Sequence, residues 1–137
     1  MLKRHEIREA AFKVLFALDT SPDADRDMAY AAALPENEAV PAYMLKLIDG
    51  VTANQDALDA QLSTHLKKGW TLKRLSKTDL IILRLGLFEI TDEDDLPAKA
   101  AINEAVELAK TYADEQSAKF INGVLAHFVD AEDTAAK

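Results

Sequence analysis

The sequence contains no cysteine and only four glycines and four prolines among its 137 residues. The absence of cysteine excludes disulfide scaffolds, thiolate zinc sites and cysteine nucleophiles. The three histidines, His5, His65 and His127, are scattered along the chain, so an all-histidine metal site is not expected. Because glycine and proline are scarce and no run of alternating β-branched residues occurs, the whole chain is predicted to be helical.

The sequence signatures of active sites are also missing. There is no phosphate-binding glycine loop, no histidine pair at i and i+4, and no nucleophile elbow around a serine. We therefore expect no catalytic residue, no metal and no cofactor, and we predict a non-enzymatic protein. Residues 1–18 alternate charged with apolar side chains, so we expect neither a signal peptide nor a membrane anchor and predict a cytoplasmic protein.

The stretch that organises the chain is residues 76–90. Its apolar side chains fall on all sides of a helix, which predicts a helix buried on every side, with Ser76 as its N-cap. Arg84 and Glu89 interrupt the apolar run and lie roughly 140° apart around the axis, too far to pair with each other. Each therefore needs a partner on a neighbouring helix, because an unpaired buried charge is costly. Glu104 is the best candidate partner for Arg84.

Hydrophobic periodicity predicts the remaining helices. They are expected at residues 3–18, 23–33, 42–66, from 97 onward and at 117–130, with a helical turn at 70–75. Residues 91–95 are predicted to form a solvated acidic loop, and residues 131–137 a frayed end.

The first predicted helix carries a candidate RNA-binding surface. His5, Phe12 and Phe16 lie together by angle, with Arg8 between them and the apolar core line. Aromatic rings beside cations allow unstacked RNA bases to stack while phosphates are neutralised. The alternative, which the pattern alone favours, is that Phe12 and Phe16 only widen the apolar face against another helix.

The outer face of the last predicted helix holds Lys119, Asn122, Gly123 and His127. A glycine inside a helix costs about 1 kcal/mol relative to alanine, so Gly123 indicates the close approach of another segment. A contact with another helix of the chain is the expected reason, and a contact with a partner is the alternative.

Charge is unevenly distributed in this chain, whose net charge is −8. Residues 1–18 and 63–84 have net charges of +2 and +5, whereas the other segments are acidic. A negative net charge argues against nucleic-acid binding, but two basic segments that met would create a local basic surface. We hypothesise that they form one strip, in which His5, Phe16 and His65 are stacking surfaces between the cations.

Several ordered motifs resemble those of a known family. They are Arg84-Leu-Gly-Leu-Phe-Glu89, Pro97, Ala101-Ile-Asn-Glu-Ala-Val-Glu-Leu-Ala-Lys110 and Ser117-Ala-Lys-Phe-Ile-Asn-Gly-Val-Leu125, preceded by Arg8-Glu9-Ala10, Leu15-Phe16, Gly69-Trp70 and Arg74-Leu75. This set covers nearly the whole chain, is weakest across residues 19–45, and resembles the transcription antitermination factor NusB family.

The resemblance implies an all-α, NusB-like fold of about seven helices in two small packed bundles. We expect one RNA-binding domain over residues 1–137, with an N-terminal half at 1–67 and a C-terminal half at 68–137. The resemblance also implies a protein that pairs with NusE, a small-subunit ribosomal protein, to bind the boxA element of ribosomal RNA leader transcripts. The complex would then join RNA polymerase and suppress termination.

The resemblance also carries over site residues by position. Phe16, His65 and Phe120 match family sites near the RNA, and Asp79 matches a site that faces NusE. Phe120 also falls on the predicted buried face of the last helix, so the periodicity and the resemblance disagree there. The full expected RNA-binding set is Lys3, Arg4, His5, Arg8, Lys13, Phe16, His65, Lys119 and Phe120.

Two other functions remain open from the sequence. One is the NusB-like RNA-binding module of some bacterial ribosomal RNA cytosine methyltransferases, although 137 residues hold no cofactor-binding half for catalysis. The other is a homodimeric interaction scaffold, in which the aromatic strip of the first helix is a self-association surface.

Overall fold

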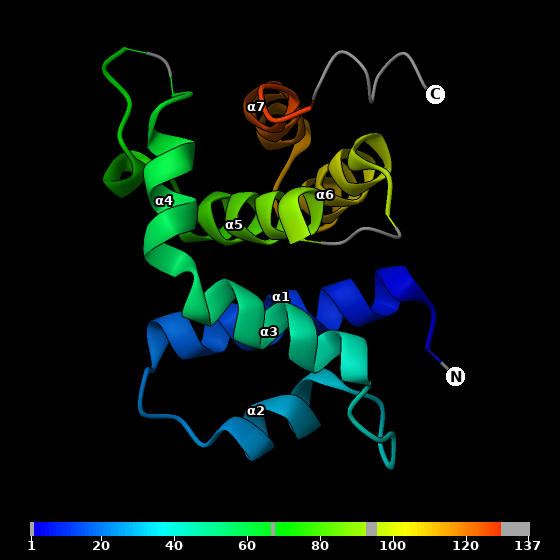
Figure 1. Ribbon diagram of the computed structural model, residues 1–137. Coiled ribbons are helices and arrows are strands. Elements are labelled where there is room, and N and C mark those ends of the chain that lie inside the picture. The colour runs from blue at the N-terminus through cyan, green and yellow to red at the C-terminus, as the bar shows by residue number, and fades with distance from the viewer. Residues whose placement is uncertain (1, 67, 93–95, 130–137) are drawn as a thin grey trace. The chain divides into compact units, whose positions relative to one another are not determined.

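The computed structural model describes residues 2–66, 68–92 and 96–129. Within these ranges all regular secondary structure is helical, with seven α-helices and one short 3-10 helix (Figure 1), which confirms the predicted all-α fold. The chain divides into two compact units, Met1–Ala53 and Asn54–Lys137. None of the helices described is both long enough and apolar enough to cross a membrane.

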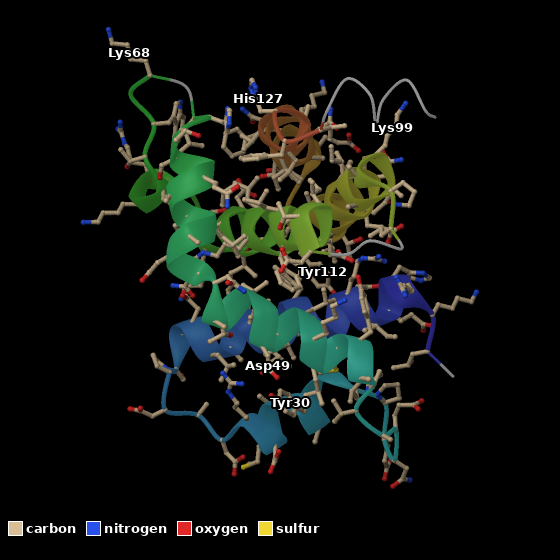
Figure 2. All side chains as sticks on the ribbon, viewed as in Figure 1. Tyr30, Asp49, Lys68, Lys99, Tyr112 and His127 are labelled. Carbon is tan, nitrogen blue, oxygen red and sulfur yellow. The ribbon has the colours of Figure 1, made fainter. Side chains whose placement is uncertain are left out.

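The N-terminal unit contains α1 (Arg4–Thr20), α2 (Arg26–Ala33) and α3 (Ala42–Ala53), and α1 packs against both of the others. The Asp25 side chain caps α2 by accepting hydrogen bonds from two backbone N–H groups of its first turn. Arg26 in α2 pairs with Asp49 in α3 at 3.1 Å (Asp49 is labelled in Figure 2). The side chains of this small core that solvent does not reach are Ala11, Val14, Met44, Leu47 and Ile48.

The boundary between the units differs from the division at residues 67 and 68 that we expected. The helix predicted at 42–66 is two helices, α3 and α4 (Gln55–Ser63), because Asn54 between them has a non-helical backbone conformation, with φ −110° and ψ 14°. Just before this break, the Thr52 hydroxyl donates to the Ile48 carbonyl at 2.7 Å, a bond that often bends helices. The apolar period runs through the break, so periodicity alone gives no sign of it.

The C-terminal unit is built around α5 (Lys77–Asp92), which packs against α4, α6 (Ala98–Tyr112) and α7 (Glu115–Ala126). Every residue of α5 from 81 to 89 is buried, as the sequence predicted. The Ser76 hydroxyl caps α5 by accepting from the Asp79 N–H at 3.1 Å. The predicted helical turn before it is the 3-10 helix η1 (Leu72–Arg74).

The other helix ends differ from the expected ones by a few residues. α5 continues through Asp92, so residues 91 and 92 are helical rather than part of the predicted acidic loop. The rest of that predicted loop, residues 93–95, and the predicted frayed end, residues 131–137, lie outside the described residues. α7 begins at Glu115 because the Asp114 carboxylate caps it, accepting from the Ser117 N–H at 2.7 Å. It ends at Ala126, before the predicted end at residue 130.

Gly86, in the middle of α5, allows α6 and α7 to approach closely. A Cβ atom at Gly86 would lie 2.8 Å from Leu125 Cδ1 in α7 and 3.2 Å from Ala105 Cβ in α6. Both of these residues are buried, so neither can move aside into solvent. The contact therefore requires glycine for steric reasons rather than for backbone freedom.

Arg84 pairs with Asp59 in α4, which corrects the expected partner Glu104. The guanidinium Nε and one NH2 group donate to the two carboxylate oxygens at 2.7 and 2.8 Å. Such a two-point bond is strong because the planar fork matches the carboxylate. The Arg84 side chain is 9% exposed and that of Asp59 is 24% exposed. Arg84 thus fixes α4 against the side of α5.

We expect Gly86→Ala to destabilise the fold by about 1–2 kcal/mol, because overpacking outweighs the gain in helix propensity. Gly123→Ala is the matched control. Its Cβ would meet no described atom within 4 Å, and we expect it to stabilise the fold by up to about 1 kcal/mol. Urea midpoints of both variants measure the difference, and equal midpoints would contradict the steric role of Gly86.

We expect Asp59→Ala to cost about 3 kcal/mol, because it leaves the buried Arg84 guanidinium without its partner. Arg84→Met should cost clearly less, since it removes the charge that needs compensation and leaves a carboxylate that water can reach. Denaturant unfolding of the two variants tests this order. A larger loss for Arg84→Met would show that its packing and other contacts matter more than the ion pair.

Candidate nucleic-acid interface

The side chains of the expected α1 surface separate into an exposed and a buried group. Arg8 is 2% exposed and Phe12 is 4% exposed, whereas Phe16 is 37% exposed. For Phe12 the structure therefore supports the alternative of a wider apolar face. Arg8 is likewise buried rather than open to a phosphate. The exposed members of the group are Lys3, Arg4, His5, Lys13 and Phe16.

Local contacts hold the charged residues of α1 in different surroundings. The Arg4 guanidinium lies 4.3 Å from the centre of the Tyr43 ring in α3, a cation–π contact. Lys13 instead lines a cavity of about 170 Å³ whose wall also includes Glu6 and Glu9. Carboxylates beside a lysine weaken its attraction for phosphate. Among these cations, Arg4 is thus better placed than Lys13 for contact with RNA.

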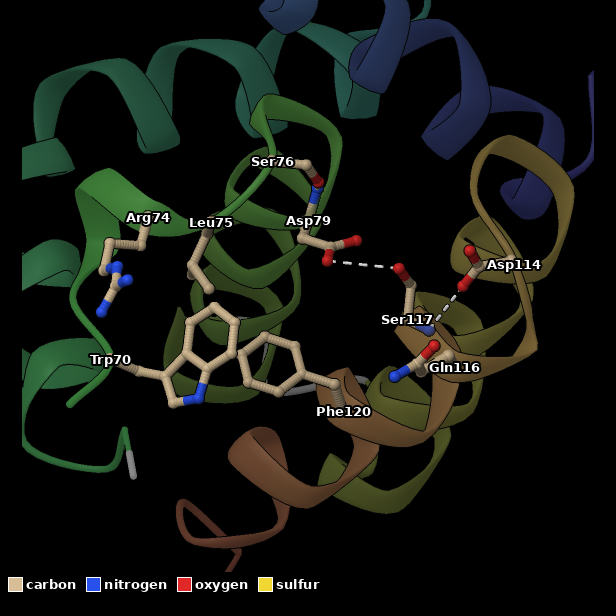
Figure 3. A pocket seen from close by; sticks show the side chains of 9 residues that line it. All are labelled: Trp70, Arg74, Leu75, Ser76, Asp79, Asp114, Gln116, Ser117 and Phe120. Carbon is tan, nitrogen blue, oxygen red and sulfur yellow. Dashed lines mark hydrogen bonds between the residues drawn. The ribbon is translucent and has the colours of Figure 1, made fainter. Parts of the chain in front are cut away.

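The C-terminal unit has a cavity of about 280 Å³ between the start of α5 and the start of α7 (Figure 3). The Ser117 hydroxyl donates to Asp79 Oδ2 at 3.2 Å, while the Ser117 N–H donates to Asp114. The other carboxylate oxygen, Asp79 Oδ1, is shielded from solvent and has no hydrogen-bond partner among the residues described. The lining residues are Trp70, Arg74, Leu75, Ser76, Asp79, Asp114, Gln116, Ser117 and Phe120. We call this the carboxylate cavity.

An unsatisfied carboxylate oxygen makes the carboxylate cavity receptive to a hydrogen-bond donor. An ionised carboxylate only accepts hydrogen bonds, and burying it without a donor is unfavourable. A donor from a second molecule would remove that cost. Asp79 thus supplies this cavity with a carboxylate oxygen that lacks a hydrogen-bond donor. It is also the residue that the resemblance assigns to the contact with a protein partner.

A second cavity, of about 500 Å³, lies on the outer side of α7. Its lining residues are His65, Trp70, Gln116, Lys119, Phe120, Gly123, Val124 and His127. The His65 and His127 rings stack with centroids 4.7 Å apart and planes 13° apart, and Phe128 meets His65 edge-on at 4.7 Å. His127 is exposed just beyond the end of α7 (Figure 2). We call this the aromatic cavity.

Phe120 lines both cavities and is partly exposed. It therefore lies at the edge of the core, which explains why periodicity assigned it to the interior and the resemblance assigned it to the RNA. His65 and Lys119, the other expected RNA-binding residues of this unit, line the aromatic cavity with it.

Sequence reasoning did not select Trp70 or Arg74 as site residues. Trp70 is 51% exposed and lines both cavities. The Arg74 guanidinium lies 5.9 Å from the Trp70 ring and donates to the Gly69 carbonyl at 2.8 Å. Gly69 has φ +92°, a conformation that favours glycine, so it turns the chain here. The sequence did contain a signal for this site, because Trp70 is a large aromatic residue that follows a turn glycine and stands among lysines.

The structure corrects the expectation that another helix packs closely against Gly123. No described atom lies within 4 Å of the position that its Cβ would occupy, so no helix of the described chain packs closely against it. Gly123 instead faces the aromatic cavity. The sequence offered two reasons for this glycine, a contact with another helix of the chain and a contact with a partner. The structure supports the second.

In the second basic segment, which belongs to the C-terminal unit, Arg84 is buried and the other described cations are exposed. Lys67 lies outside the described residues. The exposed cations are Lys68, Lys73, Arg74 and Lys77. Lys68, Lys73 and Arg74 precede α5 and Lys77 is its first residue. Positive charge therefore lies near Trp70 in sequence, next to residues that line both cavities.

Comparison with known proteins gives consistent matches along the chain. The NusB family matches residues 5–130. The transcription antitermination protein NusB of Lacticaseibacillus paracasei is 59% identical over 98% of this chain and 100% of its own. The structure of T. maritima NusB is similar with a TM-score of 0.84 at 33% identity, covering 98% of each chain. A crystal structure of antitermination factors NusB and NusE with dsRNA gives a TM-score of 0.78 at 27% identity, covering 91% of this chain and 94% of that chain.

Proposed function

This chain belongs to the NusB family, and we propose that it is a transcription antitermination factor that binds RNA together with NusE. The observation that carries this proposal is the match, along nearly the whole chain, to relatives named for antitermination. The RNA is the boxA element of ribosomal RNA leader transcripts, and the complex acts on RNA polymerase in the cytoplasm. The function requires binding surfaces and no chemistry on a substrate.

The surfaces of both units support RNA binding. Exposed Arg4 and exposed Phe16 both lie on α1, about 18 Å apart along its axis, and Lys119 adjoins Phe120 in the wall of the aromatic cavity. Stacking on rings holds unpaired bases, and cations neutralise the phosphates between them. A net charge of −8 does not prevent this, because phosphates respond to the local field.

The carboxylate cavity supports contact with a protein partner. Asp79 Oδ1 has no hydrogen-bond donor among the described residues, and an ionised carboxylate repels RNA phosphate while attracting N–H groups and cations. A related structure contains NusE beside NusB. We therefore assign the carboxylate cavity to NusE.

We expect Asp79→Asn to weaken the complex with NusE by about 10- to 150-fold, the loss of a hydrogen bond to a charged group. The free energy of unfolding of the variant itself should change little, because the cap with Ser76 uses the backbone N–H of Asp79 and not its side chain. Ser117→Ala is the control, since it removes the internal bond and leaves the carboxylate. Isothermal titration calorimetry measures both, and unchanged NusE affinity for Asp79→Asn would leave Asp79 with a structural role only.

We expect Lys3→Gln combined with Arg4→Gln to lower RNA affinity and to reduce the slope of log K against log salt by about 0.7 per lost phosphate contact. Phe16→Ala should lower affinity by about 1–3 kcal/mol and leave the slope unchanged, because stacking depends little on salt. Fluorescence anisotropy with boxA RNA and NusE, at several salt concentrations, measures both. Lys99→Gln, an exposed lysine of α6, is the control.

These affinity measurements can also show that α1 does not bind RNA. If neither change alters RNA affinity while the variants stay folded, the exposed face of α1 does not contact RNA. The RNA surface would then be confined to the C-terminal unit.

A further inference from the structure

Asn122 is the only asparagine of the chain that is followed by glycine. The other three asparagines, Asn37, Asn54 and Asn103, precede glutamate or glutamine. The backbone nitrogen of the residue after an asparagine is able to attack the asparagine side chain, and a side chain on that residue obstructs the attack. Because glycine has no side chain, the pair Asn122–Gly123 is chemically the most reactive of the four.

The surroundings of this pair leave the reacting atoms accessible. Asn122 and Gly123 are both exposed on α7. Apart from the adjoining backbone of α7, no described atom lies within 4 Å of the position that a Gly123 Cβ would occupy. No described neighbour therefore shields the pair, and water reaches it.

The helical conformation of α7 opposes the attack while the helix is intact. The helix pairs the Gly123 N–H with the carbonyl four residues earlier, that of Lys119. In addition, the helical ψ angle of about −42° holds the Gly123 nitrogen turned aside from the Asn122 side chain. The attack therefore requires α7 to open locally.

The position of Gly123 favours such an opening. It lies three residues before Ala126, the last residue of α7, and helices fray at their ends. Glycine also weakens a helix more than any residue except proline. Val124 and Leu125 are buried and hold this turn in the core, so the open state is a minor one. Local openings of this kind occur below the free energy of global unfolding.

We propose that Asn122 is a site of spontaneous deamidation that is gated by local opening of α7. In the open state the Gly123 nitrogen forms a bond to Asn122 Cγ, and the Nδ2 group leaves as ammonia together with the proton of the Gly123 N–H. Water then hydrolyses the resulting cyclic imide at either of its carbonyls. Hydrolysis at the backbone carbonyl gives isoaspartate at position 122, and hydrolysis at Cγ gives aspartate.

The two products have different consequences for α7. Aspartate keeps the normal backbone and places a negative charge one helical turn from Lys119. Isoaspartate lengthens the main chain by a methylene group, so the residues after it lose the hydrogen-bond register of the helix. Val124 and Leu125 follow directly, and Leu125 is the residue of α7 closest to Gly86. Isoaspartate therefore loosens the contact between α7 and α5.

Peptide mass spectrometry of the full chain, aged at mildly alkaline pH with and without urea, tests the site. In urea we expect Asn122 to deamidate ahead of Asn37, Asn54 and Asn103. In the native chain it should still react first, but more slowly than in urea. Gly123→Ala should slow the reaction in urea because its methyl group obstructs the attack. It should also increase the ratio of the urea rate to the native rate by about fivefold, because alanine strengthens the helix.

Glu38→Gly is the matched control for the helical gate. It creates the same dipeptide at Asn37, which is exposed and lies between α2 and α3 rather than in a helix. In the native chain, Asn37 of this variant should deamidate faster than Asn122 does in the parent.

Urea unfolding separates the two products. Asn122→Asp carries the aspartate product alone and should keep the urea midpoint of the parent. The fraction of aged parent protein that an isoaspartyl methyltransferase labels should unfold at a lower urea concentration.

Three outcomes would overturn the inference, and none of these measurements involves RNA or NusE. If Asn122 in the native chain stays intact for as long as Asn103 does, α7 does not open at this point. If Asn122 reacts as fast in the native chain as in urea, the helix does not gate the reaction. If Gly123→Ala leaves the rate in urea unchanged, the attack does not come from the nitrogen of residue 123.

Discussion

The fold of the C-terminal unit depends on covering α5, a helix with apolar residues on every side. In water such a helix is stable only when other helices exclude solvent from its whole circumference. α4, α6 and α7 pack against α5, and two features of α5 fix their positions. Gly86 sets how closely α6 and α7 approach, and the two-point bond from Arg84 to Asp59 sets where α4 lies. A void or a shift at either place would expose apolar surface of α5.

The positions of the two cavities follow from how the other helices pack around α5. α7 buries Ile121, Val124 and Leu125 and leaves Lys119 and Gly123 exposed. Asp114 caps the start of α7, and Ser117 in that first turn meets Asp79 at the start of α5. The same helix contact that fills the core thus orders the carboxylate cavity and forms one wall of the aromatic cavity.

The sequence allowed the existence and type of nearly every helix to be predicted, because each amphipathic pattern and cap acts locally. It failed where the outcome depends on three-dimensional neighbours. The break at Asn54 was hidden because the apolar period continues through it. The partner of Arg84 was misassigned because the chain has many acids at plausible positions, and periodicity does not rank Asp59 above Glu104. The burial of Arg8 on α1 was likewise beyond a pattern argument.

The two cavities share the Trp70 and Phe120 side chains but differ in charge. Carboxylates on one side disfavour phosphate and favour a donor from a protein, whereas rings and a lysine on the other side favour an RNA base. The two cavities therefore differ in the ligand that their charges favour. If a ligand in one cavity fixes the shared rings, it lowers the ordering cost of a ligand in the other. Linkage makes any such coupling reciprocal, so RNA would strengthen binding of the protein partner by the factor by which the partner strengthens binding of RNA.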